Sequence, residues 1–249
     1  MARAIQSSNL LPAPPLRTGV LAAAAAGLAV AEFTAALAAP ALHLSPRFVP
    51  ESGVVFLAAI LVAAGRVQGY HPHPRFGPAN ALTTLRLALV ALLVAAIGEA
   101  HTAVLAWAVT AVAIVASVLD GVDGWLARRS ALTSPFGARF DMETDALLIL
   151  VLSVLAWRWE RAGAWVLACG LMRYAFVAGA WTWPWLTRAL PPSLRRKAVC
   201  VVQIVGLAII VAPIVMPPLS AWLAAATLAM LTWSFAVDVR WLAVRRSAP

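Results

Sequence analysis

Residues 102–158 read TAVLAWAVTAVAIVASVLDGVDGWLARRSALTSPFGARFDMETDALLILVLSVLAWR, and they contain two apolar runs, 102–120 and 141–158, separated by a polar segment. Each run has close to the roughly 20 apolar residues that an α-helix needs to cross the hydrocarbon core of a membrane. Alanine, leucine and valine follow one another without the two-residue alternation of a barrel strand, which favours helices. The stretch predicts two transmembrane helices joined by a polar connection.

Six further apolar runs occur along the chain, at 19–42, 50–66, 80–98, 163–182, 197–216 and 219–239. Of the 249 residues, 63% are hydrophobic and only 12% are charged, against about 25% charged in soluble domains. We therefore predict an all-α protein, a polytopic transmembrane helical bundle. The run at 50–66 is the weakest, because its uninterrupted apolar core extends only from Gly53 to Gly65, and a half-inserted helix is the alternative there. The first run is longer than the apolar region of a signal peptide, so we expect an uncleaved span.

The basic residues indicate how the chain is oriented. If the N-terminus is cytoplasmic, eight spans return the C-terminus to the same side, and most of the 19 lysines and arginines fall in cytoplasmic segments, as the positive-inside rule requires. These loops would face anionic lipids, which explains the net charge of +9 without nucleic acid as a partner. We expect a multi-pass protein of the cell membrane with both termini in the cytoplasm.

Half of the ten acidic residues lie between positions 120 and 145. Asp120 and Asp123 are three residues apart, and Asp141 and Asp145 are four apart, so each pair shares one face of a helix. Carboxylates are costly near lipid, and four together repel one another unless a cation neutralises them. Oxygen ligands suit Mg²⁺ or Mn²⁺, and two ions bridged by shared carboxylates would suit displacement at phosphorus. The pattern predicts a metal site at the cytoplasmic side, with Asp120, Asp123, Asp141 and Asp145 as ligands.

The residues that follow the first aspartate pair fit a phosphorylated substrate. Gly124 and Ala127 lie on the same helical face as Asp120, and small side chains beside a metal site let a substrate approach the backbone. Arg128 supplies a planar guanidinium for a phosphate. A small-residue face for helix packing is the structural alternative for Gly124 and Ala127, but it does not account for the aspartates or for Arg128.

Together these positions read Asp120-x2-Asp123-Gly124-x2-Ala127-Arg128-x8-Gly137-x3-Asp141-x3-Asp145. The pattern resembles the signature of the CDP-alcohol phosphotransferase (CDP-alcohol phosphatidyltransferase) family at every defined position. A second fragment, Asn80-x2-Thr83-x2-Arg86, looks like a segment often found ahead of that signature. The resemblance extends over a six-helix core at about 75–240. It implies a six-helix catalytic membrane domain at 75–249, preceded by an N-terminal region at 1–74 with one or two extra transmembrane helices.

The resemblance also implies an activity and roles for the matched residues. Proteins of the family transfer the phosphatidyl group of a CDP-linked lipid such as CDP-diacylglycerol to an alcohol, and CMP leaves. The aspartates would bind Mg²⁺ or Mn²⁺, with Asp145 a further ligand or the general base, and a homodimer would be common among relatives. The nucleotide would be contacted by residues from both fragments: Asn80, Thr83, Gly124, Ala127, Arg128 and Gly137.

The identity of the alcohol is left open by the sequence. Arg173 lies inside a predicted span, and Arg195, Arg196 and Lys197 open the next one on the cytoplasmic side. A cationic pocket of this kind would suit glycerol 3-phosphate or an inositol phosphate, although the ordinary positive-inside signal explains 195–197 equally well. Glycerophosphate-using relatives tend to carry a Lys-Thr-x2-Gln-like segment here, and the chain's KAVCVVQ at 197–203 does not match it.

Three other features are interpreted without catalytic chemistry. The His71-Pro72-His73-Pro74 run is expected to be a loop, because its two prolines prevent a helix. Cys169 and Cys200 are expected to be buried free thiols, and Glu143 is left outside the site. A membrane transporter for ions or protons is the alternative function, since transporters also place carboxylates inside helical bundles. Transport sites usually lie near the middle of the membrane, whereas these aspartates are expected at span ends.

Overall fold

The structure, a computed structural model, describes residues 15–130 and 132–245, and the side chains of residues 68, 69, 123, 127 and 128 lie outside that description. Over this part of the chain the fold is helical, without strands, and it contains eight long helices. They are α1 (Leu16–Ala41), α2 (Phe48–Ala64), α4 (Pro78–Ala96), α5 (Ala103–Ser130), α6 (Pro135–Arg158), α7 (Leu167–Thr182), α8 (Leu194–Val211) and α9 (Leu219–Val244). The short helices are α3 (Val67–Tyr70), η1 (Ala164–Val166) and η2 (Pro184–Thr187).

Five segments are long and apolar enough to cross a membrane: α1, α4, α5 up to Leu126, Ala164–Thr182 and α9. Their outward faces carry large apolar side chains, such as Phe33, which is 67% exposed, and Trp233, which is 56% exposed. A surface of this kind would be unstable in water and is expected against lipid. The predicted class, a polytopic bundle of transmembrane helices, is confirmed. Whether α2, an apolar helix of 17 residues, crosses the membrane completely stays a prediction.

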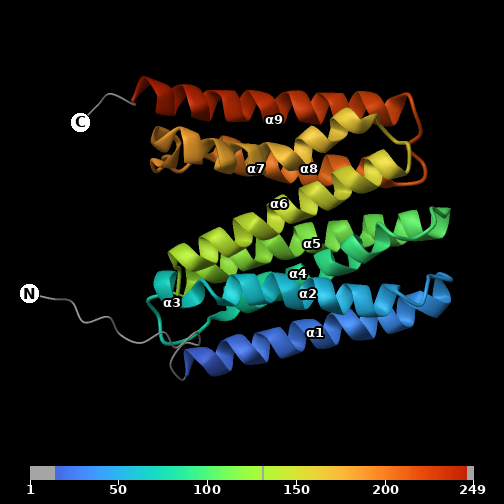
Figure 1. Ribbon diagram of the computed structural model, residues 1–249, viewed down its shortest axis with the longest axis horizontal. Helices are drawn as coiled ribbons and strands as arrows, with labels where there is room; N and C mark the ends of the chain where they lie inside the picture. The colour runs from blue at the N-terminus through green and yellow to red at the C-terminus, as the bar shows by residue number, and fades with distance from the viewer. Residues whose placement is uncertain (1–14, 131, 246–249) are drawn as a thin grey trace, which may run out of the picture.

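The helices form two groups with α6 crossing between them (Figure 1). Helices α1 and α2 pack against α4, which also contacts α5 and α6. On the other side of α6 lie α7 and α8, and α9 packs on α8. Helix α4 is therefore the most enclosed element, and a close-packed core of apolar side chains from α4, α5, α6 and α8 surrounds it.

The two extra N-terminal helices lie directly on the predicted catalytic region. Gly27 of α1 lets the helices approach closely, since a Cβ there would come within 2.6 Å of Phe56 and 3.2 Å of Thr84. Helices α1 and α2 thus cover one side of α4. The division into regions 1–74 and 75–249 stays a prediction. In the structure, the helices of the first region pack directly on those of the second.

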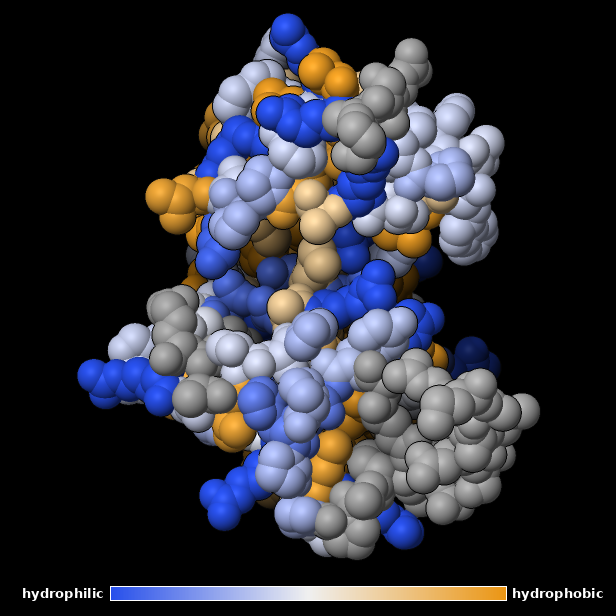
Figure 2. Space-filling view, turned by 90° about the vertical axis from the view of Figure 1, so that its left-hand side faces the viewer, coloured by the Kyte–Doolittle hydropathy of each residue, from blue (hydrophilic) through white to orange (hydrophobic). Residues whose placement is uncertain are grey.

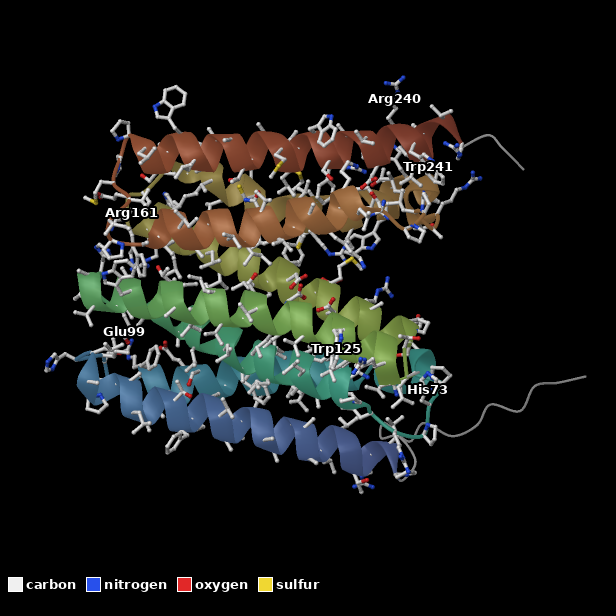
Figure 3. The ribbon with its side chains drawn as sticks, turned by 180° about the vertical axis from the view of Figure 1, so that it is seen from behind. His73, Glu99, Trp125, Arg161, Arg240 and Trp241 are labelled. Carbon is white, nitrogen blue, oxygen red and sulfur yellow. The ribbon has the colours of Figure 1, made fainter. Side chains whose placement is uncertain are left out.

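The bundle has two ends. Both described ends of the chain lie at one end (Figure 1), which we call the terminal end, and α4, α6 and α8 begin there. The connections 97–102, 159–163 and 212–218 lie at the opposite end, which we call the far end. Figure 3 shows His73 and Arg240 toward the terminal end and Glu99 and Arg161 at the far end.

Helices α5 and α6 are longer than the predicted spans at 102–120 and 141–158. Helix α5 continues to Ser130, and α6 begins at Pro135. The polar residues directly after Asp120 include no proline, so α5 can continue beyond the apolar run. Ser134 caps α6 by accepting a hydrogen bond from the Gly137 N–H at 3.0 Å, with Pro135 at the first helical position. As a result the aspartates lie within the helices and not at their ends.

Candidate functional site

Three of the four predicted metal ligands come together between α5 and α6. Asp120 from α5 and Asp141 and Asp145 from α6 each offer a carboxylate oxygen, and these atoms lie within 4.8 Å of one another. The four-residue spacing on α6 puts Asp141 and Asp145 on the same face, and that face is turned toward Arg86 of α4, which also contacts Asp120. The Asp123 side chain is outside the described atoms, so its ligand role stays a prediction.

Arg86 of α4 holds the three carboxylates together. Its side chain is fully buried, and Nη1 lies 2.7 Å from Asp120 Oδ1 and 2.5 Å from Asp141 Oδ1. Nη2 pairs with Asp145 Oδ1, and Nε donates to the Ala116 carbonyl at 3.2 Å. A buried guanidinium is stable only when carboxylates balance its charge and acceptors pair with its N–H groups. Here helices α5 and α6 supply both.

The sequence placed Arg86 in a polar stripe with Asn80 and Thr83 but did not assign it to the site. The signal was present, because an arginine inside an apolar helix needs a carboxylate partner. A second residue that was missed is Cys200 of α8, whose Sγ lies 3.6 Å from Asp145 Oδ2. It is a free thiol as predicted, but half-buried where a buried thiol was expected, and it brings a fourth helix to the cluster, after α4, α5 and α6.

The donor set fits a divalent cation. Three carboxylates carry three negative charges, and Arg86 offsets one of them, which leaves the described cluster with a formal excess of two. Carboxylate oxygens are the ligands that Mg²⁺ and Mn²⁺ prefer. The half-buried side chains of Asp120 and Asp145, 24% and 15% exposed, can still be reached by an ion from the surface.

The predicted nucleotide residues Asn80, Thr83 and Gly137 lie together beside the cluster. Asn80 and Thr83 are buried on α4, about two turns and one turn before Arg86, respectively. A Cβ at position 137 would lie 2.6 Å from Asn80 Oδ1, so only glycine lets α6 approach Asn80 this closely. Gly124 of α5 is half-buried. The side chains of Ala127 and Arg128 are outside the described atoms.

The predicted acceptor residues lie on α7 and α8, and three of them have acidic partners. Arg173 pairs with Glu143 of α6 at 2.5 Å, and Arg195 pairs with Asp238 of α9 at 2.5 Å. Arg195 also donates to the carbonyl and the hydroxyl of Ser234, and Arg196 lies 3.2 Å from Asp238. Lys197 is exposed. Seen from the terminal end, the surface is hollowed between the two groups of helices, and hydrophilic residues line the hollow (Figure 2).

The His71–Pro74 run forms a loop, as predicted, and it is hydrogen-bonded to residues at the start of α6. His71 shares hydrogen bonds of 2.8 Å with the Ser134 hydroxyl and with the Arg75 carbonyl, and His73 contacts the Thr133 carbonyl at 2.9 Å. His71 is buried. Since Ser134 caps α6, the loop helps to position the helix that carries Asp141 and Asp145.

The fold and the cluster define a class: an integral membrane protein with a half-buried carboxylate site between transmembrane helices, in the half of the bundle toward the terminal end. Comparison with known families then gives the particular family, because the family model described as CDP-alcohol phosphatidyltransferase matches residues 76–236. The chain belongs to the CDP-alcohol phosphatidyltransferase family. Neither the curated proteins nor the solved structures gave a significant match.

The matched segment begins just before α4 and ends within α9, so it contains the whole carboxylate cluster and excludes α1 and α2. Membership makes the chain one of a family of membrane transferases of phospholipid biosynthesis that transfer a phosphatidyl group from a CDP-alcohol to an alcohol. Divalent metals are general in the family, in agreement with the donor set described above.

Proposed function

We propose that this protein transfers the phosphatidyl group of CDP-diacylglycerol to an alcohol acceptor and releases CMP. The observation that carries the proposal is the convergence of Asp120, Asp141 and Asp145 within 4.8 Å, inside the segment that matches the family. In the reaction, the acceptor oxygen forms a bond to the lipid-linked phosphorus, and the bond from that phosphorus to the CMP oxygen breaks.

We propose Asp120, Asp123, Asp141 and Asp145 as ligands for two ions of Mg²⁺ or Mn²⁺. When bound, such ions would neutralise the pyrophosphate and the leaving CMP oxygen. The protein supplies the position: Arg86 draws the carboxylates of α5 and α6 to one point, and its charge keeps the half-buried cluster from being excessively negative.

Asp145 is the proposed general base. It is the least exposed of the three carboxylates, with 15% exposure against 24% for Asp120 and 38% for Asp141. One oxygen pairs with Arg86 and the other faces Cys200, so its orientation is fixed from both sides. A base in this position would take the proton of the acceptor hydroxyl as that oxygen attacks.

The nucleotide end is assigned to the residues around the start of α4 and the facing turns of α5 and α6. Gly137 and Gly124 leave room beside the backbone, and Asn80 and Thr83 provide polar atoms. Arg128 would contact phosphate through its guanidinium. The set of proposed nucleotide contacts is Asn80, Thr83, Gly124, Ala127, Arg128 and Gly137.

For the acceptor we propose a phosphorylated alcohol, glycerol 3-phosphate or an inositol phosphate, bound by Arg173, Arg195, Arg196 and Lys197. Arginine pairs with phosphate through two parallel hydrogen bonds. Arg173 and Arg195 are each 21% exposed, so both can be reached from the hollow. Their partners Glu143 and Asp238 would hold the guanidinium groups in place until a phosphate competes for them.

The site is proposed to face the cytoplasm, with both termini on the same side. The basic residues near the terminal end support this sidedness through the positive-inside rule. A lipid substrate would enter sideways from the bilayer while the CDP group stays in water at the same surface. A homodimer is proposed from the resemblance to the family.

The decisive experiment measures CMP release by purified protein with CDP-diacylglycerol, Mg²⁺ or Mn²⁺, and separate acceptors: glycerol 3-phosphate, inositol phosphate, inositol, serine and choline. Metal-dependent release with one acceptor is the expected result. Absence of release together with absence of CDP-diacylglycerol binding would overturn the proposed reaction. Release with an unphosphorylated acceptor alone would keep the reaction and overturn the phosphate-binding role of the four basic residues.

A further inference from the structure

A second buried guanidinium lies at the far end of the bundle. Arg161 follows α6 and is 3% exposed. Its Nη2 approaches His101 Nε2 in the 97–102 connection, and its Nη1 approaches the Val215 carbonyl and the Met216 sulfur in the 212–218 connection. Its own carbonyl accepts a hydrogen bond of 2.6 Å from Ser220. Arg161 therefore lies where three inter-helix connections meet.

The guanidinium of Arg161 is poorly satisfied at this junction. Its contacts with Val215 and His101 are 3.4 and 3.5 Å long, beyond the usual 2.7–3.2 Å of N–H···O bonds, and a thioether is a weak acceptor. Nε is buried without a hydrogen-bond partner among the described residues. Unlike Arg86, Arg161 makes no ion pair in the described part of the chain.

A second buried donor near Arg161 is also unpaired. The Trp159 side chain is 6% exposed, and its Nε1 has no hydrogen-bond partner in the part of the chain that the structure describes. The Trp159 and His101 ring centroids are 4.9 Å apart, so Trp159, His101 and Arg161 form one cluster. Indole and guanidinium nitrogens only donate hydrogen bonds. The cluster thus has buried donors and a positive charge in excess.

No carboxylate among the described residues forms an ion pair with Arg161. Glu99 is buried, but its oxygens accept hydrogen bonds from the Ser45 backbone N–H at 2.9 Å and the Ser45 hydroxyl at 2.6 Å. Glu160, between Trp159 and Arg161 in sequence, is exposed. The His101 side chain is exposed at the edge of the cluster, and the pKa of its imidazole is lowered, first by desolvation and then by the charge of Arg161.

We propose that the Trp159–His101–Arg161 cluster binds a small inorganic anion of the size of chloride, held by the Arg161 guanidinium and the Trp159 N–H. A buried charge without a counter-charge is strongly destabilising, and an anion removes that cost while it accepts from the unpaired donors. The unpaired nitrogens are both buried, so a bulky lipid headgroup does not reach them. The site is separate from the carboxylate cluster and does not depend on the proposed reaction.

The test is the unfolding midpoint of the full-length protein in a neutral detergent, at constant sodium concentration, as gluconate is replaced by chloride. Gluconate is too large for the buried cluster and serves as the reference anion. We expect a saturable increase of about 3–6 °C at chloride concentrations roughly ten times the dissociation constant. Arg161→Gln should abolish the chloride dependence, and Arg158→Gln, which removes an exposed arginine of the same turn, should retain it.

Trp159→Phe keeps an aromatic side chain but removes the N–H together with part of the indole, so it tests the site without depending on whether the Arg161 variant folds. We expect about tenfold weaker apparent chloride affinity in this variant, the size of one lost hydrogen bond in the interior. A midpoint that does not respond to chloride in the unmodified protein would overturn the proposal. So would an unchanged chloride response in both Trp159→Phe and Arg161→Gln, or a response only to anionic lipid.

Discussion

The bundle contains two deeply buried arginines, Arg86 in the middle of α4 and Arg161 at the far end, and the two are balanced in opposite ways. Arg86 pairs with three carboxylates from α5 and α6, so the described cluster around it is negative overall. Arg161 makes no ion pair among the described residues and has a buried donor beside it without a partner. The first environment is suited to a cation and the second to an anion.

The difference teaches that a buried charge by itself says little about function. What matters is the sign of the charge left over after its neighbours are counted, because that remainder must be met by a ligand, a protonation change or strain. The excess negative charge of the carboxylate cluster lies inside the segment matched to the family. At the far end Arg161 also lies inside that segment, but the positive charge left over there is not carried by any residue that was predicted to form a site.

The largest expected effect comes from removing the proposed base of the negative cluster. Asp145→Asn keeps the shape and removes both the charge and the proton acceptor. Turnover, measured as CMP release, should fall by about 10²–10⁴-fold, the usual contribution of general acid–base catalysis, while binding of CDP-diacylglycerol largely survives.

The control for this prediction is Glu51→Gln, which removes an exposed carboxylate of α2 outside the cluster. Surface substitutions of this kind change stability little, and turnover should stay close to that of the unmodified protein. Near-normal turnover in Asp145→Asn would exclude it as the base.

The second effect concerns Arg86 itself. Arg86→Gln leaves three carboxylates without their buried counter-charge and should lower the free energy of unfolding by about 3 kcal/mol, the lower end for a broken buried pair, since the carboxylates are partly exposed. Mg²⁺ or Mn²⁺ should restore more of the unfolding midpoint in this variant than in the unmodified protein. The matched change at the far end, Arg161→Gln, should show no such rescue by divalent ions. Equal responses in both variants would contradict the assignment of opposite signs to the two ends.

Much of the fold could be predicted from the sequence, because transmembrane helices depend on the length and polarity of single segments. The eight predicted spans correspond to the eight long helices. The extent of α5 and α6 was harder to predict. The first apolar run ends at Asp120 and the second begins at Asp141, but α5 continues after Asp120 and α6 begins before Asp141, both through polar residues. Apolarity indicates contact with lipid. The start of α6 is set instead by the cap Ser134 and by Pro135 at its first position, six residues before the apolar run.

The carboxylate cluster could be predicted because spacing along a helix fixes which side chains share a face. The pairings of the arginines could not, because they depend on which helices touch. Arg173 and Arg195 carry no signal in sequence that points to Glu143 and Asp238, which are 30 and 43 residues away. For the same reason Cys200 could be predicted as a free thiol, but its partial exposure and its approach to Asp145 could not.

A neutral buried polar group provides a smaller test of the same reasoning. Gln203 of α8 is fully buried, and among the described residues its amide has only the weak donor Cys169 as a neighbour and makes no hydrogen bond of ordinary geometry. Because no charge is involved, Gln203→Leu should raise the free energy of unfolding by about 1–2 kcal/mol, the cost of an unsatisfied polar group. Thermal unfolding would measure this change, with Ser153→Ala as a control, since the buried Ser153 hydroxyl already donates to the Ile149 carbonyl. A destabilised Gln203→Leu protein would mean that a bound water satisfies the amide.

The smallest effect is a pH dependence at the far end. The pKa of His101 is lowered in the folded protein by partial burial and then by Arg161, so the folded state disfavours the charged imidazole. Stability should be complete above the unfolded pKa of about 6.5 and should decline as the pH falls below it. His101→Gln should flatten this dependence of the unfolding midpoint between about pH 7 and pH 5. Chloride should also reduce it, because an anion beside Arg161 weakens the repulsion that protonated His101 meets. If chloride left the pH dependence of the unmodified protein unchanged, the anion would not lie between these two groups, and the contrast between the two ends would rest on Arg86 alone.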